Sequence, residues 1–327
     1  MKKKLLSLLL TIILAIFGSY VLAFLCRPLD NDTTIQHIRA FHEMPDDCFD
    51  VIIYGSSHAQ RGFSSTKLYD EFGIRAYNYG ANWQRINTTR LFLEDSLRTQ
   101  NPKVVLIETY YANSYEKDVY PDGQISYTMC MDSFDGKIKF LRECFGNDVN
   151  KWFSYYFPLC AFHENWKGLC KDSFSLRIFD TSFHHMNMGF SPSELIIPNT
   201  IANINDDKQV ELSEKAVEIL QDMVNICNDR DIDVIFYTVP YDHTFIYSDA
   251  MKDFCNKNEC KYFNLYEYVE EVGLDEKTDF SDKDHLNTYG SEKVASFFGK
   301  YIKDNYDLVD YRTIENNDWI KARNSTN

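Results

Sequence analysis

The segment Asp50-Val51-Ile52-Ile53-Tyr54-Gly55-Ser56-Ser57-His58 begins with an apolar run and continues into a glycine and two serines. The run predicts a short buried strand, and the glycine predicts a tight turn directly after it. Two further runs of this kind occupy residues 103–108, which follow a proline, and residues 233–239, which precede one. All three are continuous and rich in β-branched residues, a pattern typical of parallel strands covered on both faces.

Helical patterns lie between and after these runs. In residues 213–229, apolar side chains recur every three or four positions, and Ser213 is a candidate N-cap. Residues 288–306 repeat the pattern near the end of the chain. Strands that alternate with helices predict an α/β fold, with a doubly wound parallel sheet between two layers of helices.

Residues 114–208 interrupt this alternation. They contain the aromatic run Trp152-Phe153-Ser154-Tyr155-Tyr156-Phe157 and no run of the strand type. Two interpretations stay open: an insertion over the carboxyl edge of the sheet, where α/β folds bind ligands, or a helical subdomain with its own core. The aromatic run fits either stacking on sugar rings or a buried cluster. We expect one α/β domain over residues 28–312 and a polar, frayed tail over residues 313–327.

The first 27 residues predict a membrane anchor. Lys2, Lys3 and Lys4 precede residues 5–25, which carry no charge. At about 1.5 Å per residue this stretch is long enough to cross a hydrocarbon layer of about 30 Å. Lysines favour the cytoplasmic side, so we expect a single-pass protein whose remaining residues lie outside the membrane. A cleaved signal peptide and a buried core helix are the alternatives.

Charge and cysteine spacing exclude several other classes. The formal net charge is −15 and no basic stripe is present, so nucleic acid is not an expected partner. None of the nine cysteines is spaced as C-x-x-C. His184-His185 has no acidic or cysteine partner at ligand spacing. We therefore expect neither a metal nor another cofactor.

Two polar clusters carry the expected chemistry. Ser57 follows the first strand, which places its hydroxyl at the carboxyl edge of the sheet. Asp282 and His285 share one loop ahead of the last helix, and an acid at this spacing can bind Nδ1 of the imidazole. Since Nε2 can then accept a proton, we predict Ser57 as nucleophile, His285 as base and Asp282 as the acid that orients it. Asp284 is the alternative acid, but an extended loop would direct its side chain elsewhere.

Gly55-Ser56-Ser57 after the first strand and Asp282-x-x-His285 before the last helix resemble the first and last blocks of the SGNH (GDSL-like) hydrolases. The resemblance implies a small three-layer, flavodoxin-like domain with a parallel sheet. Position 56 holds serine where the family usually has aspartate. The same form occurs in envelope relatives with an N-terminal membrane segment, which include the protein implicated in D-alanylation of teichoic acids and proteins linked to acetylation of secreted polysaccharides.

The resemblance also implies an oxyanion hole, to which the family contributes a glycine amide and an asparagine side chain. Residues 78–82, Asn-Tyr-Gly-Ala-Asn, resemble the glycine block, so Gly80 is the candidate donor beside the amide of Ser57. The candidate asparagine is Asn113, which stands in Tyr-Ala-Asn where the family has Gly-x-Asn. Asn82, or a hole built from amides alone, is the alternative.

These residues predict a serine-dependent O-acyl ester hydrolase or O-acyltransferase that forms an acyl-enzyme at Ser57. The expected location implies a substrate among acylated glycans of the cell envelope, exported glycans or small esters. The alternative is a non-catalytic glycan-binding or assembly protein on the same fold, with a membrane-bound acyltransferase as its partner. A lipase or thioesterase would need a deep apolar cleft, which a sequence does not reveal.

Overall fold

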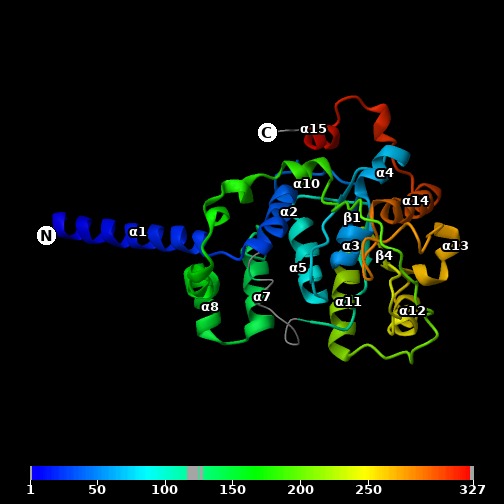
Figure 1. The fold of residues 1–327 in the computed structure, drawn as a ribbon, viewed down its shortest axis with the longest axis horizontal. Helices are drawn as coiled ribbons and strands as arrows, with labels where there is room; N and C mark the ends of the chain where they lie inside the picture. The colour runs from blue at the N-terminus through cyan, green and yellow to red at the C-terminus, as the bar shows by residue number, and fades with distance from the viewer. Residues whose placement is uncertain (1, 116–124, 126–127, 325–327) are drawn as a thin grey trace.

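The computed structural model describes residues 2–115, 125 and 128–324, and a five-stranded parallel sheet lies at its centre (Figure 1). The strands follow the order β2-β1-β3-β4-β5, and every neighbouring pair is parallel. This is the flavodoxin-like order of doubly wound sheets, whose switch point lies between β1 and β3. The strands are β1 Val51–Tyr54, β2 Ala76–Asn78, β3 Val104–Glu108, β4 Asp233–Thr238 and β5 Lys261–Asn264.

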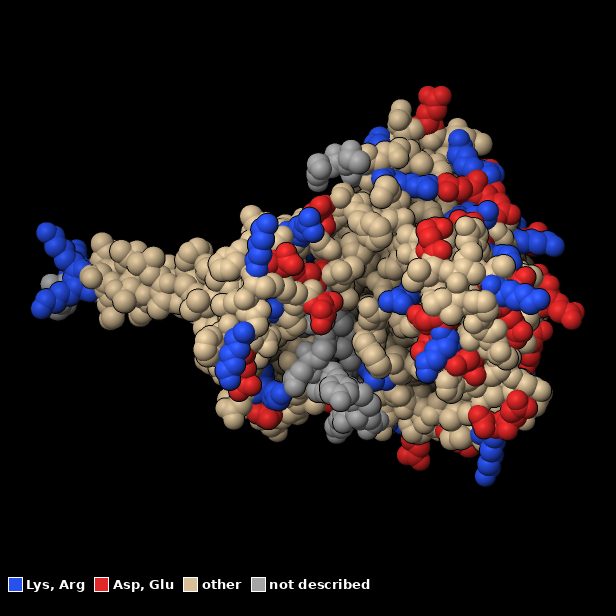
Figure 2. All heavy atoms as spheres, viewed as in Figure 1, with Lys and Arg blue, Asp and Glu red and all other residues tan. Residues whose placement is uncertain are grey.

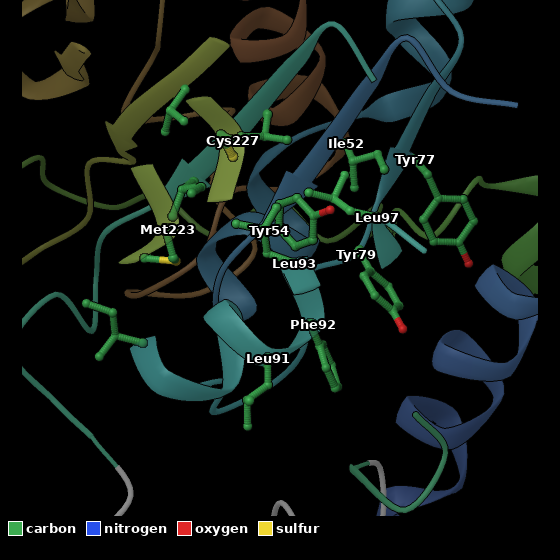
Figure 3. Packing of buried hydrophobic residues seen from close by; sticks show 14 of the residues in the cluster. Ile52, Tyr54, Tyr77, Tyr79, Leu91, Phe92, Leu93, Leu97, Met223 and Cys227 are labelled. Carbon is green, nitrogen blue, oxygen red and sulfur yellow. The ribbon is translucent and has the colours of Figure 1, made fainter. Parts of the chain in front are cut away.

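Helices cover both faces of the sheet because successive strand side chains point to opposite sides. Ile52 and Tyr54 pack into one core (Figure 3), which is completed by α2 Asp32–His42, α5 Ile86–Ser96, α11 Glu214–Asn228 and α12 Ser248–Lys257. Val51 and Ile53 pack into the opposite core, completed by α3 Ser57–Gly62, α4 Ser65–Phe72, α13 Val269–Val272 and α14 Thr288–Asn305. The predicted three-layer α/β fold is thus confirmed.

The predicted elements correspond closely to the observed ones. The three apolar runs form β1, β3 and β4, and residues 213–229 form α11, where the Ser213 hydroxyl accepts a hydrogen bond from the amide of Ala216 at 3.2 Å. The last predicted helix is α14, capped by the side chain of Asn287. The edge strands β2 and β5 were not predicted, because they are only three and four residues long and include polar positions.

The described residues of the insertion form helices and no strand. The helices are α7 Phe134–Phe145, α8 Val149–Tyr156, α9 Pro158–Phe162 and α10 Ser182–Met186, with short 3-10 turns at η2 His163–Gly168, η3 Lys171–Phe174 and η4 Leu176–Phe179. α7 packs on α5, α9 on the N-terminal helix α1, and α10 on α2. The extended part, residues 191–202, passes beside the carboxyl edge, where the amide of Ser191 donates to the carbonyl of Gln60 at 2.9 Å. The helices of the insertion thus pack to the side of the sheet and share the core of the α/β domain through Phe140 and Tyr155, so they have no separate core among the described residues, and the extended part borders the carboxyl edge.

The expectation of a frayed tail is wrong for residues 313–324. After η6 Tyr311–Thr313 the chain forms α15 Asp318–Asn324, and the side chain of Trp319 is fully buried. Its indole stacks on Tyr69 with centroids 4.2 Å apart, and Nε1 donates to the carbonyl of Ala76 at 2.9 Å. One large aromatic side chain thus docks an otherwise polar segment against the edge of the sheet.

The N-terminal helix α1 Lys2–Leu25 extends away from the domain (Figure 1). Among the described residues, α1 alone is long and apolar enough to cross a membrane. The chain then turns through η1 Leu29–Asn31 into α2.

Candidate active site

The turn after β1 presents the hydroxyl of Ser57. Gly55 adopts a φ of +142°, and a Cβ at this position would lie 2.6 Å from Cβ of Glu108, so the turn requires glycine. The hydroxyl of Ser56 accepts a hydrogen bond from the amide of His58 at 3.2 Å and caps α3. Ser57 is therefore the first residue of α3, half-buried at the carboxyl edge of the sheet.

The loop before α14 brings His285 to this turn. Phe280 and Leu286 form an antiparallel bridge, and the amide of Ser281 donates to the carbonyl of His285 at 2.9 Å, which closes the loop on itself. Nε2 of His285 lies 2.8 Å from Oγ of Ser57. A base must lie within hydrogen-bond reach of the proton it removes, and this distance meets that condition.

Asp282 holds the other side of the imidazole. Its Oδ1 and Oδ2 lie 2.9 and 3.0 Å from Nδ1 of His285. Oδ1 also accepts the amides of Asp284 and His285, and Arg61 approaches Oδ2 at 3.6 Å. With Nδ1 facing a carboxylate, the tautomer that leaves Nε2 as acceptor is favoured. Asp284, the alternative acid, places its carboxylate near Asp242 and His243 instead.

Burial and hydrogen bonding set the protonation states of His285 and Asp282. Desolvation lowers the pKa of His285 below its usual value, and the neighbouring Asp282 only partly offsets that effect. Burial would raise the pKa of Asp282, but the amides of Asp284 and His285 and the imidazole outweigh it and lower this pKa. At neutral pH the arrangement is therefore a neutral imidazole beside a carboxylate, which is the state a general base requires.

The three oxyanion donors predicted from the sequence meet different surroundings. The amide of Ser57 begins α3, so it has no intrahelical acceptor. Gly80 packs against α3, but its amide donates to Oδ1 of Asn78 at 3.1 Å. Oδ1 of Asn113 accepts the amide of Ser213 at 2.7 Å, which ties this side chain to the start of α11. The alternative, Asn82, lies half-buried in the turn after Gly80. Among these candidates, a described contact occupies the donor of Gly80, whereas the contact of Asn113 uses its acceptor oxygen and leaves Nδ2 to donate.

Glu108 is a site residue that sequence reasoning missed. Parallel register pairs Tyr54 with Ile107, so Glu108 lies beside the turn at Gly55. Its Oε2 accepts the amide and hydroxyl of Ser56 at 3.2 and 2.8 Å, and its Oε1 accepts the amide of Tyr110. Burial raises the pKa of Glu108 to about 7, although these three hydrogen bonds oppose the shift. A carboxylate that ends an apolar strand was the signal that could have identified it.

The imidazole of His285 lies next to a stack of aromatic rings that begins with His58. The His58 ring lies 5.1 Å from that of His285 and stacks on Tyr110 at 4.0 Å, with Tyr241 5.0 Å from His58. Burial lowers the pKa of His58, and His285 and Arg61 lower it further. Beyond the stack lies an open cleft of about 370 Å³, lined by Tyr110, Tyr111, Tyr241, Tyr247, His243 and Asp284 among others.

Two groups of residues have ligand types that metals use. His184 is fully buried beside His37, and Nε2 of His185 lies 3.0 Å from a carboxylate oxygen of Glu43. Asp242, His243 and Asp284 place one ligand atom each within 4.8 Å of one another, with Asp242 hydrogen-bonded to His243. Exposed acidic groups commonly gather without an ion. We therefore assign no metal to either group.

Comparison with known proteins leaves the chain without a family. No known family profile matches it, and no curated protein matches it. Among solved structures, the chain is similar to a protein from Bacteroides fragilis described as a candidate acylhydrolase. The two are 10% identical, the alignment covers 82% of this chain and 94% of the other, and the TM-score is 0.39. A likeness this distant adds nothing to the geometry above.

Proposed function

We propose that the chain is a membrane-anchored, serine-dependent O-acyl esterase or O-acyltransferase of the SGNH type, acting on a cell-envelope or exported glycan. The 2.8 Å contact between Oγ of Ser57 and Nε2 of His285 carries the proposal. It joins groups 228 positions apart in the sequence, and the carboxylate of Asp282 completes the arrangement at Nδ1. Hydroxyl, imidazole and carboxylate in this order are the parts of a serine nucleophile and its base.

In the proposed reaction, Oγ of Ser57 attacks the carbonyl carbon of an ester while Nε2 of His285 takes the hydroxyl proton. Asp282 stabilises the imidazolium that forms, and the Ser57 amide donates to the developing oxyanion. His285 then returns its proton to the departing alkoxide, which leaves an acyl-enzyme. Water attack on that intermediate makes the protein an esterase, and attack by a sugar hydroxyl makes it an acyltransferase.

The cleft beside the site supports a sugar as one part of the substrate. Tyrosine rings present apolar faces with polar edges, and the carboxylate of Asp284 can accept hydrogen bonds from hydroxyl groups. Asp242 and Asp284 carry like charges here, an arrangement that disfavours an anionic glycan. Among glycans, the cleft thus favours a neutral one.

The proposed location follows from α1. Its apolar length supports a single membrane span, and Lys2, Lys3 and Lys4 at its start support a cytoplasmic N-terminus. We therefore propose residues 1–27 as the anchor and residues 28–312 as an extracytoplasmic domain, a location that would also allow a membrane-bound acyltransferase as partner.

Labelling with a fluorophosphonate probe tests the proposed nucleophile. Detergent-solubilised wild-type protein should be labelled, and Ser57→Ala should abolish labelling because the attacking oxygen is gone. Ser64→Ala is the matched control: that serine is buried and caps α4, so its loss should cost about 1 kcal/mol of stability and leave labelling intact. Wild-type protein that reacts with neither the probe nor acetyl esters, while glycan acylation in cells survives Ser57→Ala, would favour the non-catalytic alternative.

A further inference from the structure

We propose that an exposed apolar surface around the inner end of α1 lies in the leaflet of a phospholipid bilayer on the side of the domain. This base surface consists of six side chains from α8 and the turns that follow it: Phe153, Trp166, Leu169, Phe174, Leu176 and Phe179. Their exposed fractions run from 43% for Leu169 to 68% for Leu176. The inference rests on the proposed role of α1 as a membrane span.

The inner end of α1 is packed into the same part of the molecule. Ala23 is buried, and the hydroxyl of Tyr20 donates to the carbonyl of Tyr156 in α8 at 2.7 Å. Phe24 stacks on Phe179 with centroids 6.1 Å apart. Beyond the helix, the side chain of Asn165 donates to the carbonyl of Cys26 at 3.0 Å. The end of α1 is therefore packed against the elements that carry the base surface.

The length of α1 determines how deep in the bilayer the base surface and the inner end of α1 must lie. Residues 5–17 form the uncharged stretch of α1 in which every residue is exposed, and they span roughly 20 Å at about 1.5 Å per residue. A hydrocarbon layer is about 30 Å thick. The missing length must come from residues 18–25, part of which, including the buried Ala23, packs against the domain. If α1 spans the membrane, the elements beside residues 18–25 therefore enter the same leaflet.

The composition of the base surface fits this depth. Contiguous exposed apolar side chains in a soluble domain mark an interaction site, and tryptophan and phenylalanine suit the boundary between headgroups and acyl chains. Lys167, Lys171 and Arg177 lie in the same turns as Glu164 and Asp172, so basic residues outnumber acidic ones there by one. Long lysine side chains can extend to the headgroups, which limits immersion to the outer part of the leaflet. Figure 2 shows α1 as an uncharged shaft with lysines at its start, whereas Asp, Glu, Lys and Arg are spread over the visible face of the domain.

Tryptophan fluorescence in lipid nanodiscs tests the proposal on the full chain. Trp166 and Trp83 are similarly exposed, at 61% and 67%, but only Trp166 belongs to the base surface. Trp83→Phe leaves Trp166 as the exposed reporter, and Trp166→Phe leaves Trp83, while Trp152 and Trp319 are common to both variants. With phospholipid carrying a doxyl group near the headgroup, quenching should be at least twofold stronger for the Trp166 reporter. Aqueous iodide should quench the Trp83 reporter more strongly.

A second variant and an extraction assay distinguish failure of the proposed lipid contact from failure of the proposed membrane anchor. Phe174→Glu places a charge in the base surface, so it should weaken doxyl quenching of Trp166. Equal quenching of both reporters by iodide, in protein that resists alkaline extraction from membranes, would overturn the base surface as a lipid contact while leaving the anchor intact. Protein released by alkaline extraction would overturn both, because the depth argument requires α1 to span the bilayer.

Discussion

A serine hydroxyl becomes a useful nucleophile only when its surroundings hold it in one place, and at Ser57 much of that surrounding is Glu108. The buried carboxylate accepts three hydrogen bonds from the residues that flank Ser57 and His58, and Gly55 leaves room for its side chain. On the other side of the hydroxyl, His285 is fixed by Asp282 through both Nδ1 and its own amide. Two acidic side chains therefore position the proposed pair: Glu108 acts on Ser57 through the neighbouring Ser56, and Asp282 acts on His285 directly.

The pH dependence of activity should report His285. Its pKa lies below 6.5 because of burial, so the neutral form persists to lower pH than in a free histidine. We expect kcat/KM for an acetyl ester to be constant above this pKa and to fall as pH decreases through it, with the midpoint below 6.5. Asp282→Asn removes the charge that raises this pKa, so the midpoint should move lower still and the rate should fall by about 10⁴-fold, as in the serine-protease triad. A midpoint above 6.5 in the wild type would contradict this protonation scheme.

Glu108 should make stability increase on mild acidification. Its pKa of about 7 in the folded state exceeds that of an unfolded glutamate, near 4.3, so the folded state binds the proton more readily. This contribution to stability is absent above pH 7 and grows as pH falls toward 5, where it reaches on the order of 2 kcal/mol. Glu108→Gln should remove this slope in chemical unfolding and slow probe labelling, because the amide NH₂ would face a backbone N–H donor. The exposed Glu270→Gln variant should keep the wild-type slope, and a wild-type slope in Glu108→Gln would refute the assignment.

At the scale of elements, hydrogen bonds of Asn287 join the start of α14 to the loop that carries His285. The side chain of Asn287 caps α14 through the amide of Gly290 and donates to the carbonyls of Thr278 and Phe280 at 2.7 and 3.3 Å. A third contact reaches Leu195 in the extended part of the insertion at 3.1 Å. The start of α14 thus fixes the shape of the loop, and the extended part of the insertion stabilises that loop through Leu195.

The docking of α15 predicts a large stability effect from one substitution. Trp319→Ala should lower the free energy of unfolding by about 3 to 5 kcal/mol, because it removes a fully buried indole and its hydrogen bond to Ala76. Trp83→Ala is the matched control, since that side chain is 67% exposed and its loss should change stability by about 0.5 kcal/mol or less. Chemical unfolding in detergent measures both. Similar stabilities for the two variants would show that the C-terminal helix does not contribute to the core.

At the scale of the whole molecule, the surface of the chain has two parts of different composition, the apolar helix α1 and the charged α/β domain (Figure 2). The α/β domain is acidic and carries the proposed active site at the carboxyl edge of its sheet. The helical part of the insertion lies beside the inner end of α1 (Figure 1), where the Tyr20 hydroxyl donates to the carbonyl of Tyr156. The aromatic run at residues 152–157 is not among the residues that line the cleft beside His285.

The sequence by itself determined the parallel sheet and its covering helices, and it predicted the set of Ser57, Asp282 and His285, whose side chains lie in contact in the structure. Those features are encoded locally, in apolar runs, helical periodicity and the three-residue spacing of an acid and a histidine. Tertiary structure decided which groups near Ser57 are already occupied: Oδ1 of Asn113 by the amide of Ser213, and the hydroxyl of Ser56 by Glu108. Tertiary structure also decided that Trp319 belongs to the hydrophobic core and that the insertion packs against α1. The physical reason is that burial and hydrogen bonding between residues 50 to 250 positions apart depend on how the elements pack, which no local pattern specifies.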